Sequence, residues 1–303
     1  MGKKNYSILL IILKDGILKL VTVMMLFLLF LVSALKNGDY SSFIQVITKE
    51  NSYFLNYSFQ DFSFNNSPFF IKIGDNTFSL DEINININDS FHKLNINGNI
   101  HFSNSTPISS TLYSPNIMGP FSYIPFMECN HAVLSMKSNT LGSLNFNSDL
   151  INFNGGIAYI EKDWGTSFPK SYIWCQSNEF LNFPANFMIS IAKIPLGCVN
   201  FTGIISDISF ENKEYKFATY YGARLKKYDV NNDSIFIEVE QGNKTLSVSS
   251  LSENRKFLLA PSKGKMNKEI LESISSNVYV ELKENNIIIF SDTSINCGLE
   301  IVI

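Results

Sequence analysis

The chain has 303 residues, enough for one large β domain or two ordinary domains with full cores. Hydrophobic residues make up 45% and charged residues 17% of the chain, which excludes an intrinsically disordered protein. The net charge is −3 and no stripe of lysine or arginine exists, so we expect no nucleic-acid partner. The four cysteines lack CxxC spacing and the three histidines lack metal-ligand spacing. We therefore expect no metal site, no cofactor and no dense disulfide framework.

Residues 1–38 form an apolar N-terminal segment. Lys3 and Lys4 precede it, and the run Leu20–Leu35 is almost wholly apolar. This pattern predicts a signal peptide or a short membrane anchor, although the run is shorter than the roughly 20 residues of a spanning helix. Taken literally, the protein is secreted or membrane-tethered through residues 17–35, and membrane association is expected there.

From residue 40 onward the pattern is typical of β-strands. Apolar residues at Ile83, Ile85 and Ile87 alternate with asparagines, which places one face of a strand in a core and the other in water. Strands recur at intervals typical of sandwiches and barrels. Residues 278–290 predict a hairpin with asparagine at its turn. Only Lys263–Ser275 has a helical spacing, through Met266, Ile270 and Ile274.

The order of predicted elements excludes several enzyme folds. No βαβ alternation is present, and neither a GxGxxG, a P-loop nor a GxSxG motif occurs. A seam near 135–150 divides the body into two halves, 39–145 and 146–303. We predict an all-β fold of two barrel or sandwich halves with very few helices, and barrels of about eight strands can enclose one small apolar ligand.

The most unusual segment is Gly155–Phe180, which we interpret as a hairpin with its turn at Gly165–Lys170. In a regular hairpin, one strand directs a set of alternate residues to one face and the other strand does the same. If the faces coincide, one surface carries two carboxylates, three aromatic rings and two amides. Those residues are Tyr159, Glu161, Asp163, Tyr172, Trp174, Gln176 and Asn178.

Such a surface could bind an aromatic headgroup, and a carboxylic acid in an apolar site has a raised pKa and can donate a proton. A structural interpretation stands beside this one. Residues 161–163 then form a solvated charge cluster and Trp164 packs in a core. A bulge near Asp163 or Gly165 would also shift the pattern of faces.

Residues 161–178, EKDWGTSFPKSYIWCQSN, resemble the signature of the tocopherol cyclase-like family, E-K-[DN]-W-G-x-x-F-P followed by W-x-Q-x-N. The resemblance covers about residues 40–303. Further matching pieces are Tyr113–Pro120, Pro125–His131, Phe201–Gly203, Phe217–Tyr220 with Gly222, and Gly264–Met266.

The resemblance implies a lipocalin-like fold with a pocket for an isoprenoid lipid. Plant members of the family close a prenylated hydroquinone into a chromanol. An acid protonates the trisubstituted alkene, and the phenol oxygen then attacks the tertiary cation. Related lipocalin-like proteins hydrate carotenoids by the same protonation, with water as the nucleophile.

Carried onto this sequence, the resemblance makes Asp163 the first candidate for the acid, although the plant pattern usually has asparagine there. Glu161 and Glu128 are the alternative acids, and His131 is a relay, an orienting group or a core histidine. The proposed ligand contacts are Tyr159, Trp164, Tyr172, Trp174, Gln176 and Asn178.

The family's opening strand, F-E-G-W-Y-F-K, is replaced here by the apolar run. In a shifted reading frame, each new codon takes the third base of one codon and the first two bases of the next. Because of codon degeneracy, the codons from Leu10 to Ala34 can then encode an amino-acid sequence that contains FEGWYFK. In that frame Met24–Met25 must give Asp. We therefore also consider that this region is translated out of frame, in which case the protein is cytoplasmic or peripheral.

Three functions remain open at this point. The first is a cyclase or hydratase acting on a prenylated quinol or other isoprenoid. The second is a non-catalytic carrier that binds the same hydrophobic small molecule. The third is a secreted or membrane-tethered surface protein. Titratable groups with perturbed pKa values in the pocket would favour the enzyme.

Overall fold

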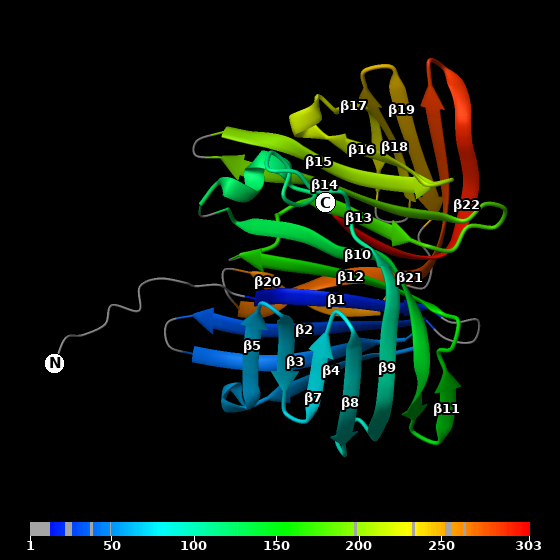
Figure 1. Ribbon diagram of the computed structural model, residues 1–303. Coiled ribbons are helices and arrows are strands. Elements are labelled where there is room, and N and C mark those ends of the chain that lie inside the picture. The colour runs from blue at the N-terminus through cyan, green and yellow to red at the C-terminus, as the bar shows by residue number, and fades with distance from the viewer. Residues whose placement is uncertain are drawn as a thin grey trace.

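The protein, described here from a computed structural model, is built almost entirely of antiparallel β-strands (Figure 1). The described residues are 13–21, 26–36, 39–48, 50–125, 127–165, 167–196, 199–231, 234–251, 256–262 and 265–303. In these ranges the helices are three short 3₁₀ turns: η1 (Phe59–Asp61), η2 (Gly119–Tyr123) and η3 (Thr219–Tyr221). The predicted all-β class with very few helices is confirmed.

The first sheet contains twelve strands in the order β4-β3-β2-β1-β12-β10-β9-β8-β7-β6-β5, with β11 paired to β10. Their bounds are β1 (Leu13–Val21), β2 (Leu26–Lys36), β3 (Asp39–Ile47), β4 (Ser52–Tyr57), β5 (Phe62–Asn66), β6 (Phe69–Ile73), β7 (Asn76–Ser79), β8 (Glu82–Asp89), β9 (Leu94–Thr106), β10 (Cys129–Phe146), β11 (Asp149–Asn152) and β12 (Ile157–Gly165).

The second sheet contains ten strands in the order β16-β15-β14-β13-β22-β21-β19-β18-β17, with β20 paired to β21. Their bounds are β13 (Tyr172–Ser177), β14 (Ala185–Leu196), β15 (Val199–Phe210), β16 (Lys213–Ala218), β17 (Arg224–Val230), β18 (Ser234–Gln241), β19 (Lys244–Leu251), β20 (Lys256–Ser262), β21 (Lys265–Glu284) and β22 (Ile287–Val302).

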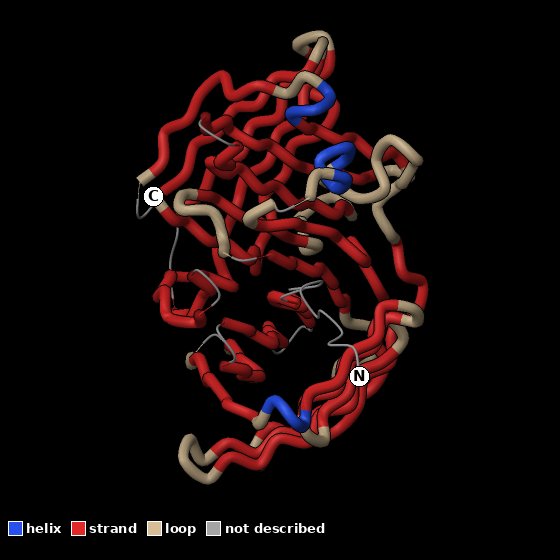
Figure 2. Tube along the Cα trace, turned by 90° about the vertical axis from the view of Figure 1, so that its left-hand side faces the viewer, coloured by secondary structure: helices blue, strands red, loops and turns tan. Residues whose placement is uncertain are grey.

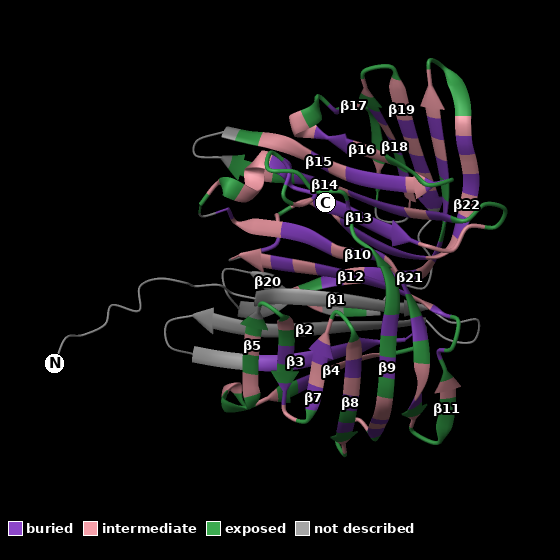
Figure 3. Cartoon of the chain, viewed as in Figure 1, coloured by how far each residue is buried: buried purple, intermediate pink, exposed green. Residues whose placement is uncertain are grey.

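Each sheet curves strongly, and the two lie one above the other with β10, β12 and β13 at their junction (Figures 1 and 2). The alternation of each strand produces three buried clusters. One fills the inside of the first sheet, a second fills the inside of the second sheet, and a third contains residues from both. Buried residues run along the junction strands in Figure 3. The third cluster, which we call the junction core, holds the candidate site.

Two local predictions from the sequence are confirmed. Ile83, Ile85 and Ile87 of β8 are all buried inside the first sheet, as the alternation predicts. Glu284 pairs with Ile287 across a two-residue turn in which Asn285 and Asn286 have positive φ angles of 52° and 62°. Asparagine tolerates this left-handed conformation, and such turns match the twist of a hairpin.

The helix expected at Lys263–Ser275 is wrong. Residues 263–264 lie outside the described residues, and from Lys265 onward the chain is strand β21. The physical reason is that a four-residue spacing fits one face of a strand as well as one turn of a helix. Ile270 and Ile274 share the face of β21 that packs into the junction core.

The apolar N-terminal run also differs from the expected anchor. Residues 1–12, with the two lysines, and residues 22–25 lie outside the described residues. The rest of the run forms β1 and β2, because antiparallel neighbours on both sides satisfy its backbone groups. No helix in the described part of the chain is long and apolar enough to cross a membrane. The reading frame of this segment stays a prediction, which sequencing of the locus tests.

Gly155–Phe180 does not form the predicted hairpin. β12 pairs with β1 and β10 of the first sheet, whereas β13 pairs with β14 and β22 of the second. The segment predicted as a turn therefore carries the chain from one sheet to the other. This change of sheet falls after β12, whereas the sequence placed the seam at 145/146, because β10, β11 and β12 stay hydrogen-bonded within the first sheet.

Candidate active site

Alternate side chains of β12 point into two different buried clusters. Ala158 and Ile160 point into the first sheet, while Tyr159, Glu161 and Asp163 point toward the second sheet and are buried. On the facing strand β13, Tyr172 and Trp174 point back into the same junction core. The predicted surface of carboxylates and aromatic rings therefore exists, and it is made by two strands of different sheets.

Glu161 lies at the centre of this surface and is 1% exposed. Its Oε2 accepts hydrogen bonds from the Tyr159 hydroxyl at 2.5 Å and from Trp174 Nε1 at 3.1 Å. Its Oε1 is buried and has no hydrogen-bond partner among the described residues. Burial is the main cause that raises the pKa of Glu161 to about 8; the charge of His131 and the two hydrogen bonds oppose it, and the charge of Asp163 adds to it. Burial therefore favours the neutral carboxylic acid over the carboxylate at this position.

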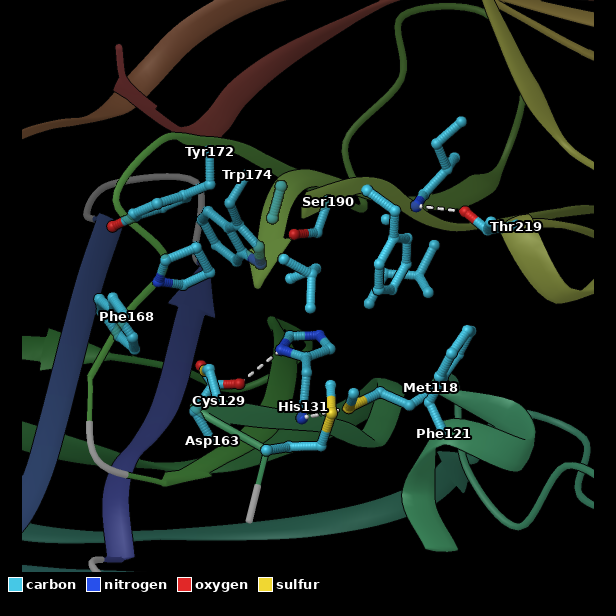
Figure 4. A pocket seen from close by; sticks show the side chains of 18 of the residues that line it. Met118, Phe121, Cys129, His131, Asp163, Phe168, Tyr172, Trp174, Ser190 and Thr219 are labelled. Atoms are coloured by element: carbon cyan, nitrogen blue, oxygen red, sulfur yellow. Dashed lines mark hydrogen bonds and ion pairs between the residues drawn. The ribbon is translucent and has the colours of Figure 1, made fainter. Parts of the chain in front are cut away.

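His131 of β10 lies directly opposite Asp163 of β12 in the strand register. Residues opposite each other across antiparallel strands have neighbouring side chains. His131 Nδ1 and Asp163 Oδ1 are accordingly 2.6 Å apart (Figure 4). His131 Nε2 lies 3.6 Å from Glu161 Oε2. Burial lowers the pKa of His131, but the charges of Asp163 and Glu161 and the hydrogen bond to Asp163 outweigh it and raise the value to about 9.

These three side chains open into a pocket at the junction of the sheets. The space between its lining atoms, including its opening, is about 820 Å³. The remaining lining is mainly apolar and aromatic, and Met118 and Phe121 from the η2 segment lie on one side of it (Figure 4). Phe121 stacks on Phe201 at 5.4 Å between ring centroids and contacts Tyr220 edge-on. A largely apolar pocket with a few converging polar groups is the usual form of a small-molecule site.

Five of the predicted site residues do not line this pocket. Tyr159 is one of them: it is buried in the junction core, and its hydroxyl reaches Glu161. Glu128 is half-buried, and Trp164 projects from the other face of β12, where Lys162 Nζ lies 5.2 Å from the centroid of its ring. Gln176 donates to Asn178, and Asn178 Nδ2 donates to the Met136 carbonyl of the first sheet at 2.7 Å. The chain of β13 continues beyond the pocket, so these two amides connect the sheets outside the pocket.

The sequence interpretation missed Glu300, which lines the same pocket and accepts a hydrogen bond from the Tyr172 hydroxyl at 2.5 Å. It also missed the contributions of Met118, Cys129 and Phe121 to the pocket wall. Glu300 left a signal in the sequence, since it is the one charged residue in the apolar run Leu299–Ile303. A buried charge in an apolar strand marks a functional or paired group.

His131, Glu161 and Asp163 also offer donor atoms within 4.8 Å of one another, which a metal site would require. Two tetrahedral ligands of a zinc ion, with bonds of about 2.0–2.2 Å, lie more than about 3 Å apart. The 2.6 Å separation of His131 Nδ1 and Asp163 Oδ1 is instead that of two atoms sharing a proton. The arrangement therefore fits proton transfer better than metal binding.

Comparison with known proteins gives matches of two kinds. The sequence profile of the tocopherol cyclase-like family matches residues 105–302. A probable chloroplastic tocopherol cyclase of Oryza sativa subsp. japonica is 26% identical over 102 residues, and the chloroplastic tocopherol cyclase of Zea mays is 24% identical over 128 residues. These stretches cover 32% and 38% of this chain but only 22% and 27% of the plant proteins.

The fold is similar to those of several solved structures. A crystal structure of CghA with Sch210972 superimposes with a TM-score of 0.58 at 8% identity, covering 97% of this chain and 89% of that one. Kievitone hydratase from Nectria haematococca gives a TM-score of 0.54 at 11% identity, covering 95% and 88%. At such low identity these similarities show the lipocalin-like fold alone.

One glycine makes room for the aromatic wall of the pocket. A Cβ atom at Gly298 would lie 2.7 Å from Trp174 Cζ3, so Gly298→Ala should displace the indole and break its hydrogen bond to Glu161. We expect a changed Trp174 fluorescence spectrum in a Trp164→Phe background and, for any reaction at this site, a loss of activity of about 100-fold. An unchanged spectrum together with full activity would contradict this arrangement.

Proposed function

Because this chain belongs to the tocopherol cyclase-like family, we propose that it binds a prenylated hydroquinone at the junction of its two sheets and closes it to a chromanol by acid catalysis. In this reaction a carboxylic acid donates a proton to the trisubstituted alkene of the prenyl chain. The phenol oxygen then bonds to the tertiary carbon that has become cationic. The reaction is an isomerisation, so it consumes no oxidant or reductant.

The observation that carries the proposal is the state of Glu161. A carboxyl group that is buried, whose pKa is raised by that burial, and that keeps one oxygen without a hydrogen-bond partner at the wall of an apolar pocket is suited to general acid catalysis. Asp163, the first candidate from the sequence, has its Oδ1 engaged by His131. We therefore assign the proton donation to Glu161 and treat Asp163 as a positioning residue.

His131 supports the donor in two ways. Its hydrogen bond to Asp163 fixes the ring, and its Nε2 faces Glu161 Oε2 at 3.6 Å. When Glu161 gives up its proton, the neighbouring imidazolium stabilises the carboxylate that remains. The same ring can return a proton to Glu161 after turnover.

The aromatic rings around Glu161 suit the cation that follows. Trp174 lines the pocket and its Nε1 is bonded to Glu161 Oε2, while Tyr159, whose ring centroid lies 6.5 Å from that of Trp174, packs behind it in the junction core. A cation close to such faces is stabilised by about 0.5–2 kcal/mol per ring. The apolar lining accommodates the rest of the prenyl chain and limits the access of water, which would otherwise capture the cation.

The proposal is tested by anaerobic incubation of the purified protein with a panel of prenylated hydroquinones. Ring closure leaves the mass unchanged and removes the oxidisable quinol, so chromatography with electrochemical detection measures it directly. Product supports the cyclase. Tight binding without product would assign the protein as an isoprenoid carrier, and a product heavier by one water would assign it as a hydratase. Two proteins should be assayed side by side: one with the apolar N-terminal segment, and one in which the shifted reading frame replaces that segment.

Glu161→Gln tests the donor directly. The amide oxygen can still accept the hydrogen bonds of Tyr159 and Trp174, but the side chain has no acidic proton. We expect turnover to fall by at least about 100-fold while substrate affinity stays within a few-fold of the wild type. In the wild type, kcat/KM should fall as the pH rises through about 8, because Glu161 is then ionised. Glu128→Gln, outside the pocket, is the matched control and should leave both unchanged.

Asp163→Asn tests the positioning role. The pKa of His131 should fall, because the negative charge that raises it is removed. We expect ligand affinity to be nearly intact and turnover to be lost, and the histidine pKa can be followed by NMR. Full activity in Asp163→Asn would remove Asp163 from the mechanism.

A further inference from the structure

A second carboxyl group lines the pocket on the wall that the second sheet provides. Glu300 of β22 is 3% exposed, and its Oε2 accepts the hydrogen bond from Tyr172 of β13. Both residues line the pocket that also contains Glu161. Tyr172 is the one residue in the described part of the chain with a hydrogen bond to Glu300.

Trp174 lies between the two carboxyl groups. Its backbone pairs directly with Glu300 across β13 and β22, so the two side chains stand next to each other on the face of the pocket. Its indole nitrogen reaches Glu161 on the opposite wall. A substrate ring packed against the indole would thus have one carboxyl group at each end.

The groups around Glu300 set its protonation. Glu272 and Lys268 of β21 face it from the neighbouring strand, Tyr172 faces it from β13, and Asp163 faces it from β12. Burial is the main cause that raises the pKa of Glu300 to about 7; the hydrogen bond from Tyr172 and the charge of Lys268 oppose it, and the charge of Asp163 adds to it.

From this placement we propose that Glu300 is the general base of the reaction: it accepts the proton of the substrate's phenolic hydroxyl while Glu161 donates a proton to the alkene. The inference rests on the proposed function. Tyr172 acts as a positioning residue, since its hydroxyl holds the Glu300 carboxylate toward the pocket.

Ring closure moves two protons and forms one C–H bond and one C–O bond. The proton of Glu161 forms a C–H bond at the less substituted alkene carbon, and the π electrons of the alkene supply that bond. The phenolic O–H bond breaks, its proton moves to Glu300, and its oxygen forms the C–O bond to the tertiary carbon. Glu161 ends as a carboxylate and Glu300 as an acid. Proton exchange with solvent then restores both, so no net proton is consumed.

This arrangement restricts the substrate class. A base opposite the acid is useful only when the nucleophile carries a proton that must leave. We therefore expect prenylated phenols and hydroquinones with a free hydroxyl next to the prenyl chain to react. Their methyl ethers should bind in the pocket and remain unchanged.

Turnover in deuterium oxide separates the two roles. The wild type should place one deuterium on the carbon that receives the proton. Glu161→Gln should give neither product nor deuterated substrate. Glu300→Gln should slow ring closure by about 100-fold. The recovered substrate should nevertheless gain deuterium in its prenyl chain, because the acid still forms the cation, which then loses a proton and reverts.

The pH profile provides a second test that does not depend on Glu300→Gln folding. Wild-type kcat/KM should rise through a pH of about 7, as Glu300 ionises, and fall through about 8, as Glu161 does. Tyr172→Phe removes the hydrogen bond that stabilises the Glu300 carboxylate, so the rising limb should move to higher pH and the falling limb should stay.

Several results would overturn the inference. Wild-type rates of ring closure in Glu300→Gln, or a rising limb that Tyr172→Phe leaves in place, would remove Glu300 from the mechanism. Loss of deuterium exchange together with ring closure in a folded Glu300→Gln protein would also contradict a separate base. If the wild type neither closes nor deuterates any quinol of the panel, the proposed function itself fails.

Discussion

The hydrogen bond from the Trp174 indole to the Glu161 carboxyl group connects the two sheets at the point where the chemistry is placed. A carboxylate buried without full compensation is costly, and here the cost is avoided by keeping the group protonated. Tyr159 and Trp174 satisfy one oxygen and leave the other in the pocket. This state depends on the apolar residues of the junction core, which exclude the water that would favour ionisation.

The architecture explains how two such carboxyl groups come to face each other. Glu161 belongs to the first sheet and Glu300 to the second, so the distance between them is set by the packing of the sheets and not by a flexible loop. Each sheet has its own interior cluster, and the strands at the junction contribute to two clusters at once. A site on rigid strands holds its groups more accurately than a site on loops.

Much of the fold was predictable because period-two alternation reports directly on strands with one buried face. β8 and the β21–β22 hairpin follow that rule. The alternation failed at β21, where Lys268 and Glu272 occupy the same face as Ile270 and Ile274. Polar groups at these positions belong to the surroundings of Glu300. The site itself therefore disturbed the pattern from which the strand would have been recognised.

The candidate site was only partly predictable, for a similar reason. Tyr159, Glu161, Asp163, Tyr172 and Trp174 do share one surface, but the prediction joined them as a hairpin, whereas they belong to two sheets. Sequence spacing gives the face of each strand and not its partners.

Glu300, more than a hundred residues from Tyr172 along the chain, could be placed beside it only by the tertiary structure. The pairing of His131 with Asp163 required the register of β10 and β12 in the same way.

The most direct test of the account is the protonation state of Glu161, measured by infrared difference spectroscopy of the ligand-free protein across a pH titration. Glu300 and Asp207 are also buried carboxyl groups with raised pKa values, so we predict a carbonyl band of buried carboxylic acids with one component that disappears with a midpoint of about 8 and is missing from Glu161→Gln. A carbonyl band whose pH dependence is the same in the wild type and in Glu161→Gln would contradict the central claim.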